Sequence, residues 1–140
     1  MRRALSARGV PSAYLSERDL VFHSPQAPEV LDLLRAMDQP ADLRAAKRVW
    51  ASRLLNLDGA ALLLQADDQA LWDLRLERLA RWQALWHRQG VLSAVRAFII
   101  EEGVARRALN DPMGGERRLT NALHLAEWLQ EVSEQVRGPR

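Results

Sequence analysis

Cysteine is absent from the 140-residue chain, which excludes disulfide bonds and thiolate metal sites. Lysine is almost absent too, since Lys47 is the only one and arginine supplies the other basic residues. We attribute this skew first to genome composition. Long apolar runs are also missing, and the charged N-terminal residues are not followed by an apolar segment. We therefore expect no signal peptide and no membrane span, and a cytoplasmic protein.

Glycine and proline are scarce, at seven and six residues, and a net charge of +2 is too small to indicate nucleic-acid binding by itself. Hydrophobic residues make up 48% of the chain, which is typical of a folded domain. The length suits one domain, and abundant Ala, Leu, Arg and Glu favour helix. We predict a mainly α fold: a single domain of about six or seven helices, with one short extended segment near the N-terminus.

Start and stop signals divide most of the chain into helices. Residues 2–8 favour helix, and residues 10–15 are the extended segment. Ser24 is expected at an N-cap with Pro25 at the first helical position, Asp42 at the next N-cap, and Asp67 or Asp68 before the longest helix. The expected helices cover residues 25–39, 43–51, 59–65, 68–89, 91–102, 104–109 and 115–132.

The spacing of apolar residues also predicts which side chains face the core. In the helix before Pro40 they are Val30, Leu31, Leu34 and Met37. In the long helix they are Trp72, Leu76, Leu79, Trp82 or Gln83, and Trp86, with Leu71, Leu74 and Leu85 widening the stripe. The following helix is nearly apolar through Val95, Phe98, Ile99 and Ile100, and Leu54, Leu55 and Leu57 form a buried connector.

No residue pattern predicts a self-contained active site. A phosphate-binding loop of the GxxxxGK type is absent. The three histidines, His23, His87 and His124, lie far apart without carboxylates at metal-ligand spacing. Glu101 and Glu102 point in different directions on a helix, so we interpret them as a solvated helix end. We predict no catalytic, cofactor-binding or metal-binding residue.

Four arginines flank the loop at residues 110–115: Arg106, Arg107, Arg117 and Arg118. The helix N-terminal amides at residues 116–119 would add anion-binding capacity, so one interpretation is a patch that contacts DNA phosphates. The alternative is a solvated face paired with Glu101, Glu102 and Glu116.

Five tryptophans also leave two interpretations open: Trp50, Trp72, Trp82, Trp86 and Trp128. Exposed tryptophans stack on nucleic-acid bases. The helical spacing of these five favours packing in the core or at a subunit interface.

Several stretches together resemble one known family. They are GVPSAYLSERDLVF at residues 9–22, SPQAPEVLDLLRAMDQPAD at 24–42, the turn at 54–57, WQALWHRQGVLSAVRAFIIEE at 82–102, and GERRLTNALHLAEWLQ at 115–130. In the same order, they resemble segments of the RecB family, the beta subunits of the exodeoxyribonuclease V (RecBCD) helicase–nuclease, which are UvrD-like superfamily 1A helicases. The resemblance runs along nearly the whole chain.

The resemblance implies an internal fragment of the 2A/2B region. Residues 1–22 would be the truncated end of the first βα unit of the second RecA-like domain, and residues 23–140 a helical 2B-like subdomain. Walker motifs and the nuclease domain are missing, so this piece alone should neither hydrolyse ATP nor cut DNA. For the parent protein the family implies ATP, Mg²⁺, DNA, and RecC-like and RecD-like subunits, in repair and recombination.

The positions matched to family motifs are Tyr14, Arg18, Asp19, Phe22, Glu116, Arg117, Arg118, Thr120 and Asn121. None has a physical reason to be catalytic, and Glu116 with Arg117 would also suit a capping arrangement with the preceding loop. The first hypothesis is therefore a non-catalytic 2B-type module that contacts DNA or sister subunits. The second is a free-standing helical module that binds proteins. A small enzyme with a hidden site is disfavoured, because it would need convergent ionisable residues in a deep pocket.

Overall fold

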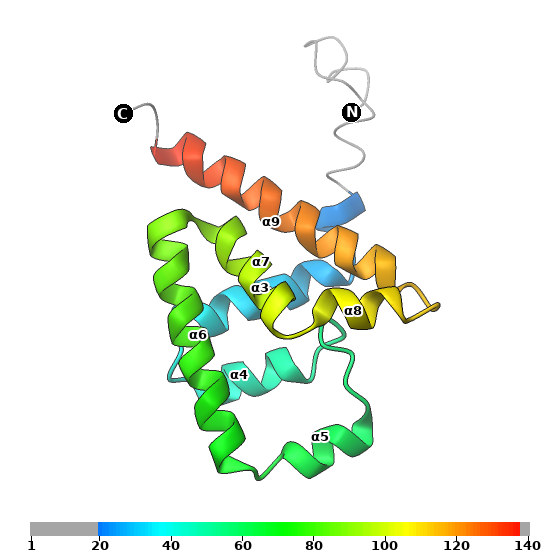
Figure 1. The fold of residues 1–140 in the computed structure, drawn as a ribbon. Helices are drawn as coiled ribbons and strands as arrows, with labels where there is room; N and C mark the ends of the chain where they lie inside the picture. Colours follow the sequence, from blue (N-terminus) through cyan, green and yellow to red (C-terminus); the bar gives the residue numbers. More distant parts are fainter. Residues whose placement is uncertain (1–19, 138–140) are drawn as a thin grey trace.

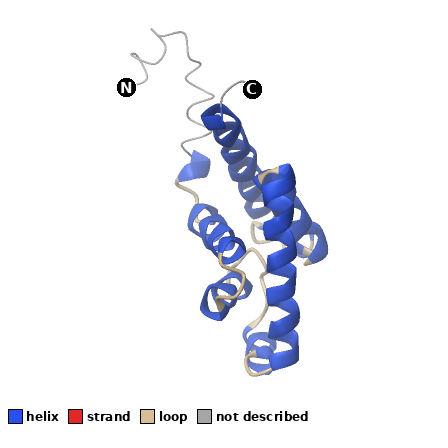
Figure 2. Cartoon of the chain, turned by 90° about the vertical axis from the view of Figure 1, so that its left-hand side faces the viewer, coloured by secondary structure: helices blue, strands red, loops and turns tan. Residues whose placement is uncertain are grey.

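The computed structural model describes residues 20–137, and all of its elements are helices (Figure 2). They are α3 (Gln26–Asp38), α4 (Leu43–Trp50), α5 (Gly59–Gln65), α6 (Gln69–Gln89), α7 (Val91–Glu101), α8 (Val104–Leu109) and α9 (Gly115–Arg137). The mainly α prediction is confirmed. The predicted helix at 2–8, the extended segment at 10–15, and the motif positions Tyr14, Arg18 and Asp19 lie outside the described residues.

Aspartate side chains begin three of the helices, because a carboxylate at the N-cap accepts a bond from an otherwise unpaired backbone amide. Asp42, Asp58 and Asp68 accept from the amides of Ala45, Ala61 and Leu71, at 3.2, 2.7 and 3.1 Å. The cap predicted at Asp42 is confirmed, and the structure selects Asp68 over Asp67. At 21 residues α6 is shorter than α9, which has 23, so the expectation that α6 is the longest helix is wrong.

The start of α3 differs from the prediction. The Ser24 hydroxyl donates to the Val21 carbonyl, so it satisfies the preceding turn instead of capping the helix. Pro25 therefore occupies the N-cap, and the helix begins at Gln26. The buried face of α3 is also rotated: Leu33 is 1% exposed, whereas Leu31, predicted to face inward, is 47% exposed.

The core lies where α3, α4, α6, α7 and α9 pack together (Figure 1). Trp82 is its centre: the ring stacks on Trp50 with centroids 6.3 Å apart and meets the edge of Phe98 at 5.5 Å. Trp72 is buried beside them, so core packing is confirmed for these three tryptophans. On the nearly apolar α7, Val95, Phe98 and Ile99 are buried, whereas Ile100 is 76% exposed.

Helices α9 and α5 lie at opposite ends of the molecule (Figure 1). Helix α9 packs against α3, α7 and α8. None of the residues of α5 is buried. The buried connector predicted before α5 is confirmed at Leu54 and Leu55, which are 5% and 1% exposed.

Candidate functional site

The loop between α8 and α9 leads into the GGERR motif, residues 114–118. The structure requires each of its two glycines for a different reason. Gly114 has a φ of +91°, a conformation that side chains with a Cβ rarely adopt. Gly115 lies so close to α8 that a Cβ there would be 2.1 Å from the Ala108 carbonyl oxygen. The glycine pair thus turns the chain and then lets the first residue of α9 pack directly on α8.

Asp111 organises this loop from within. Its carboxylate accepts hydrogen bonds from the Met113 amide at 2.9 Å, from the Asn56 side chain at 3.3 Å, and from the Arg118 guanidinium. Arg118 also donates to the Met113 carbonyl. These bonds, chiefly the one from Arg118 and then the one from Met113, hold the pKa of Asp111 below its usual value.

Arg118 is therefore an internal support of the loop. The residue is only 8% exposed, and its ion pair with Asp111 directs the guanidinium inward. Among the four arginines predicted to contact phosphate, it is the one that forms an ion pair with a carboxylate in the range 20–137. Arg106 and Arg117 are exposed, and no ion pair joins either of them to another residue in the range 20–137.

An open depression of about 640 Å³ lies over the start of α9, and it contains four of the motif-matched residues. Its lining includes Leu109, Pro112, Glu116, Arg117, Thr120, Asn121 and His124. Asn121 also ties α9 to α3, since its amide donates to the Gln26 side-chain oxygen at 3.0 Å. The Met113 amide donates to the Asp111 carboxylate, and the Gly115 amide donates to the Asp111 carbonyl. Within residues 20–137, the Glu116 side chain accepts no capping hydrogen bond from a backbone amide.

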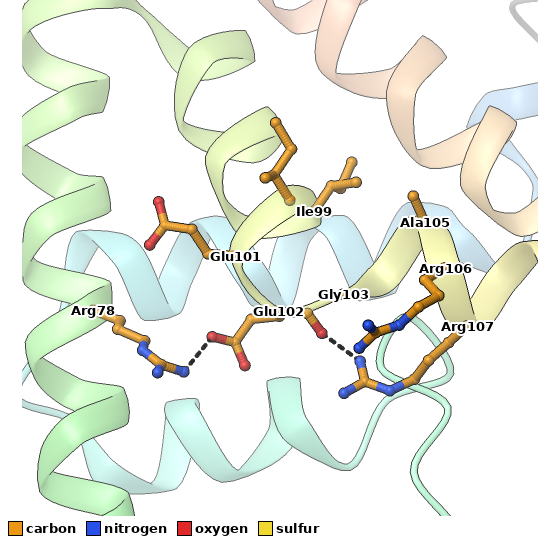
Figure 3. Close-up of a pocket in the computed structure, with 9 residues that line it drawn as sticks. Arg78, Ile99, Glu101, Glu102, Gly103, Ala105, Arg106 and Arg107 are labelled. Atoms are coloured by element: carbon orange, nitrogen blue, oxygen red, sulfur yellow. Dashed lines mark hydrogen bonds and ion pairs between the residues drawn. The ribbon is translucent and has the colours of Figure 1, made fainter.

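A second depression, of about 550 Å³, lies between the end of α7 and α8 (Figure 3). Arg106 and Arg107 line its α8 edge, and Arg78 comes from α6 on the other side. Arg107 donates to the Glu102 carbonyl, and Arg78 pairs with the Glu102 carboxylate at 2.7 Å. Arg106 lines this second depression, and Arg117 lines the one over the start of α9.

The prediction that Glu101 and Glu102 form a solvated helix end is wrong for Glu102. It is 9% exposed and accepts from Trp50 Nε1 at 3.2 Å as well as from Arg78. Glu101 instead forms a surface ion pair with Arg81 at 2.6 Å. The two carboxylates diverge, as their adjacent positions predict. In its buried position, the Glu102 carboxylate has hydrogen-bond donors around it that a solvated helix end would lack.

Arg75 was not singled out from the sequence, yet it is 6% exposed. Its guanidinium carbon lies 5.1 Å from the centre of the Trp50 ring and 4.6 Å from that of Trp72. Burial lowers the pKa of Arg75 from its ordinary value. The one nearby sequence feature that could indicate the burial of Arg75 is Trp72, three residues earlier on the same helix.

Other candidate residues stay apart. His124 lines the α9 depression, whereas His87 lies near the end of α6. Within residues 20–137, no three His, Cys, Asp or Glu side chains are grouped so that they could hold a metal ion. In the same range, no helix combines the length with the apolar character that a membrane span needs. Phe22, the described motif residue at the entry, packs on Trp128 with ring centroids 5.0 Å apart.

No protein-family model matches the chain. Comparison with curated proteins finds the RecBCD enzyme subunit RecB of Escherichia coli, 34% identical over 136 residues, or 97% of this chain. The RecB subunits of Haemophilus influenzae and Mycobacterium tuberculosis are each 33% identical over 95% and 97% of the chain. The chain spans only 11–12% of the length of these relatives. The resemblance to RecB is confirmed, and it concerns one segment of that subunit.

Proposed function

We propose that this chain is a non-catalytic helical contact module of a RecB-like subunit, within a helicase–nuclease that serves recombinational repair of double-strand breaks. The observation that carries the proposal is similarity to RecB along 97% of the chain. In this proposal, residues 1–22 close the first βα unit of a second RecA-like domain, and residues 23–140 form a 2B-like subdomain. The helical packing of α3 to α9 supports the second assignment.

The catalytic functions of such an enzyme lie elsewhere in this proposal. ATP and Mg²⁺ would be bound by the helicase and nuclease parts of the subunit, since the chain has no phosphate-binding loop motif. RecC-like and RecD-like proteins would be its sister subunits, and DNA its substrate. The module would then act by contact, either with DNA or with those subunits.

For DNA contact, we propose the surface formed by Arg106, Arg107 and Arg117. Arg106 and Arg117 are exposed and have no ion-pair partner within residues 20–137, so a phosphate would not have to displace a carboxylate. Arg107 is half-buried, and its bond to a neutral carbonyl leaves its charge uncompensated at that contact. Arg118 is left out because Asp111 already neutralises it.

The test is fluorescence anisotropy of the purified chain with a labelled duplex that carries a single-stranded tail, across a salt series. Each phosphate contact contributes a slope of roughly 0.7–0.9 to the logarithmic salt dependence of the binding constant. Replacing Arg106, Arg107 and Arg117 together by alanine should therefore lower the slope by about 2–3 and weaken binding. Circular dichroism checks that the variant is folded.

The matched control removes three exposed arginines elsewhere, Arg44, Arg48 and Arg88. It loses the same charge, so an equal loss of affinity in both triple variants would refute a localised surface. Absence of binding at low salt would reject DNA contact by this chain and leave protein contact as its role. The free-standing protein-binding module is the alternative function, and the exposed leucines of α5 suit protein contact under either function.

A further inference from the structure

Helix α5 presents leucines to solvent although it contributes no buried residue to the fold. Leu63 and Leu64 are 80% and 84% exposed. Single exposed apolar residues are common on protein surfaces. Here, however, two adjacent leucines lie on a seven-residue helix, which is too short to be stable in water from its own propensity. Contacts at its ends must therefore hold it in place.

Those contacts are specific. At the start of α5, the Asp58 carboxylate caps the helix through the Ala61 amide at 2.7 Å. At its end, the Gln65 carbonyl accepts from Trp72 Nε1 at 2.9 Å, and the Gln65 side chain accepts from the buried Arg75 at 2.8 Å. The helix is thus attached to the tryptophan cluster by its last residue. Its leucines are held in a defined orientation before any partner binds, which lowers the entropic cost of docking.

The exposed charges on the chain segment that contains α5 are acidic, although the buried Arg75 contacts the end of the helix. Residues 54–74 contain four aspartates and no lysine or arginine, in a chain with a net charge of +2. All four are exposed: Asp58, Asp67, Asp68 and Asp73. Nucleic-acid phosphates would be repelled there. A second α5 would be repelled as well, because it carries the same charges.

We propose that α5 docks into an apolar pocket, bordered by lysine or arginine side chains, on a sister protein subunit. Leu63 and Leu64 would fill the pocket, and the surrounding aspartates would pair with its basic rim. Protein interfaces have this arrangement of a desolvated apolar centre and a polar border. The inference deepens the proposed contact function and rests on it. It also separates protein contact at α5 from DNA contact at α8 and α9.

The partner can be identified in the full-length RecB-like subunit, assembled with its sister subunits. A photo-crosslinking amino acid replaces Leu64 in one preparation and Val136, which is 82% exposed, in the control. Crosslinked peptides at Leu64 should come from a sister subunit and map to an apolar surface with neighbouring lysine or arginine. Crosslinks to DNA, to another part of the same subunit, to a second copy of this subunit or to an acidic surface would overturn the inference. So would a yield at Leu64 no higher than that at Val136.

A quantitative test uses the same assembly with purified sister subunits. Leu63→Ser with Leu64→Ser should weaken association at least ~10-fold, equivalent to about 1.4 kcal/mol. Asp67→Lys with Asp73→Lys should also weaken it, mainly by slowing association. Asp67 and Asp73 are chosen because Asp58 and Asp68 cap helices. The controls are Val136→Ser and Glu134→Lys, which change exposed residues away from α5.

Unchanged association in both α5 variants would overturn the docking inference. The melting temperature of each variant should stay within about 2 °C of the wild type, since these side chains are exposed. The DNA-binding assay of the arginine variants is independent of this result. If α5 variants assemble normally while the arginine variants lose DNA binding, only the docking inference fails. If the reverse is found, the DNA contact fails and the docking inference stands.

Discussion

Replacing Gly115 with alanine tests whether the close packing of α9 on α8 is required. The added Cβ would lie 2.1 Å from the Ala108 carbonyl oxygen and 2.8 Å from its carbonyl carbon. Both are backbone atoms, so relief requires one helix to move away from the other. Forcing extra volume into a packed site costs about 1–3 kcal/mol. Alanine's helix preference offsets up to about 1 kcal/mol, so we expect a net destabilisation of about 1–2 kcal/mol.

Gly59 provides the matched control, because it too is the first residue of a helix. A Cβ at Gly59 would meet no atom within 4 Å. Gly59→Ala should therefore be neutral or stabilise the protein by roughly 0.4–1 kcal/mol, through the unfolded chain. Urea denaturation and thermal melting measure both variants. A melting temperature for Gly115→Ala that equals or exceeds that of Gly59→Ala would refute the close-packing argument.

The remaining predictions concern two carboxylates that pair with arginine side chains, the buried Glu102 and the half-buried Asp111. Glu102→Ala leaves Trp50 Nε1 and Arg78 without their shared acceptor. We therefore expect urea denaturation to show that the free energy of unfolding falls by about 2–4 kcal/mol. A fall of less than about 0.5 kcal/mol would contradict the importance of this buried network. For Asp111, Arg118 lowers the carboxyl pKa in the folded state. The resulting stability is complete above the ordinary aspartate pKa of about 4 and is lost as the pH falls through the lowered value. Asp111→Asn should remove this pH-dependent contribution, so the free energies of unfolding of the wild type and the variant should differ at pH 7 and converge towards pH 2. A difference that stays constant with pH would contradict this prediction.

Helix positions were predictable where the signal is local. Asp42 and Asp58 lie directly before their helices, and a side chain three residues from an amide needs no other part of the fold to cap it. Ser24 has the same sequence signal and fails, because its hydroxyl has a competing acceptor in the turn before it. The competing turn depends on the path of the preceding residues. A cap residue therefore predicts a helix boundary only when its side chain has no alternative local partner.

The candidate site was less predictable because its charged residues depend on distant partners. Glu102 is bonded to Trp50, 52 residues earlier in the chain. Arg75 is buried between Trp50 and another ring. A charged residue is assigned to the surface by default, since burial costs free energy unless a partner is present. Nothing in the sequence identifies these partners, because helix packing alone brings them together.

The GGERR motif illustrates how one sequence signal combines two roles. Gly115 and Arg118 hold the loop together internally, through close backbone packing and the pair with Asp111. Arg117, next in the chain to Arg118, points to a different side of the helix and is exposed. Adjacent helical residues are separated by about 100°, so one can stabilise the loop while the other faces a ligand. Binding assays that change Arg117 and Arg118 together would mix a lost contact with a lost fold. Arg117→Ala alone should weaken DNA binding without lowering the melting temperature, and Arg118→Ala should lower the melting temperature.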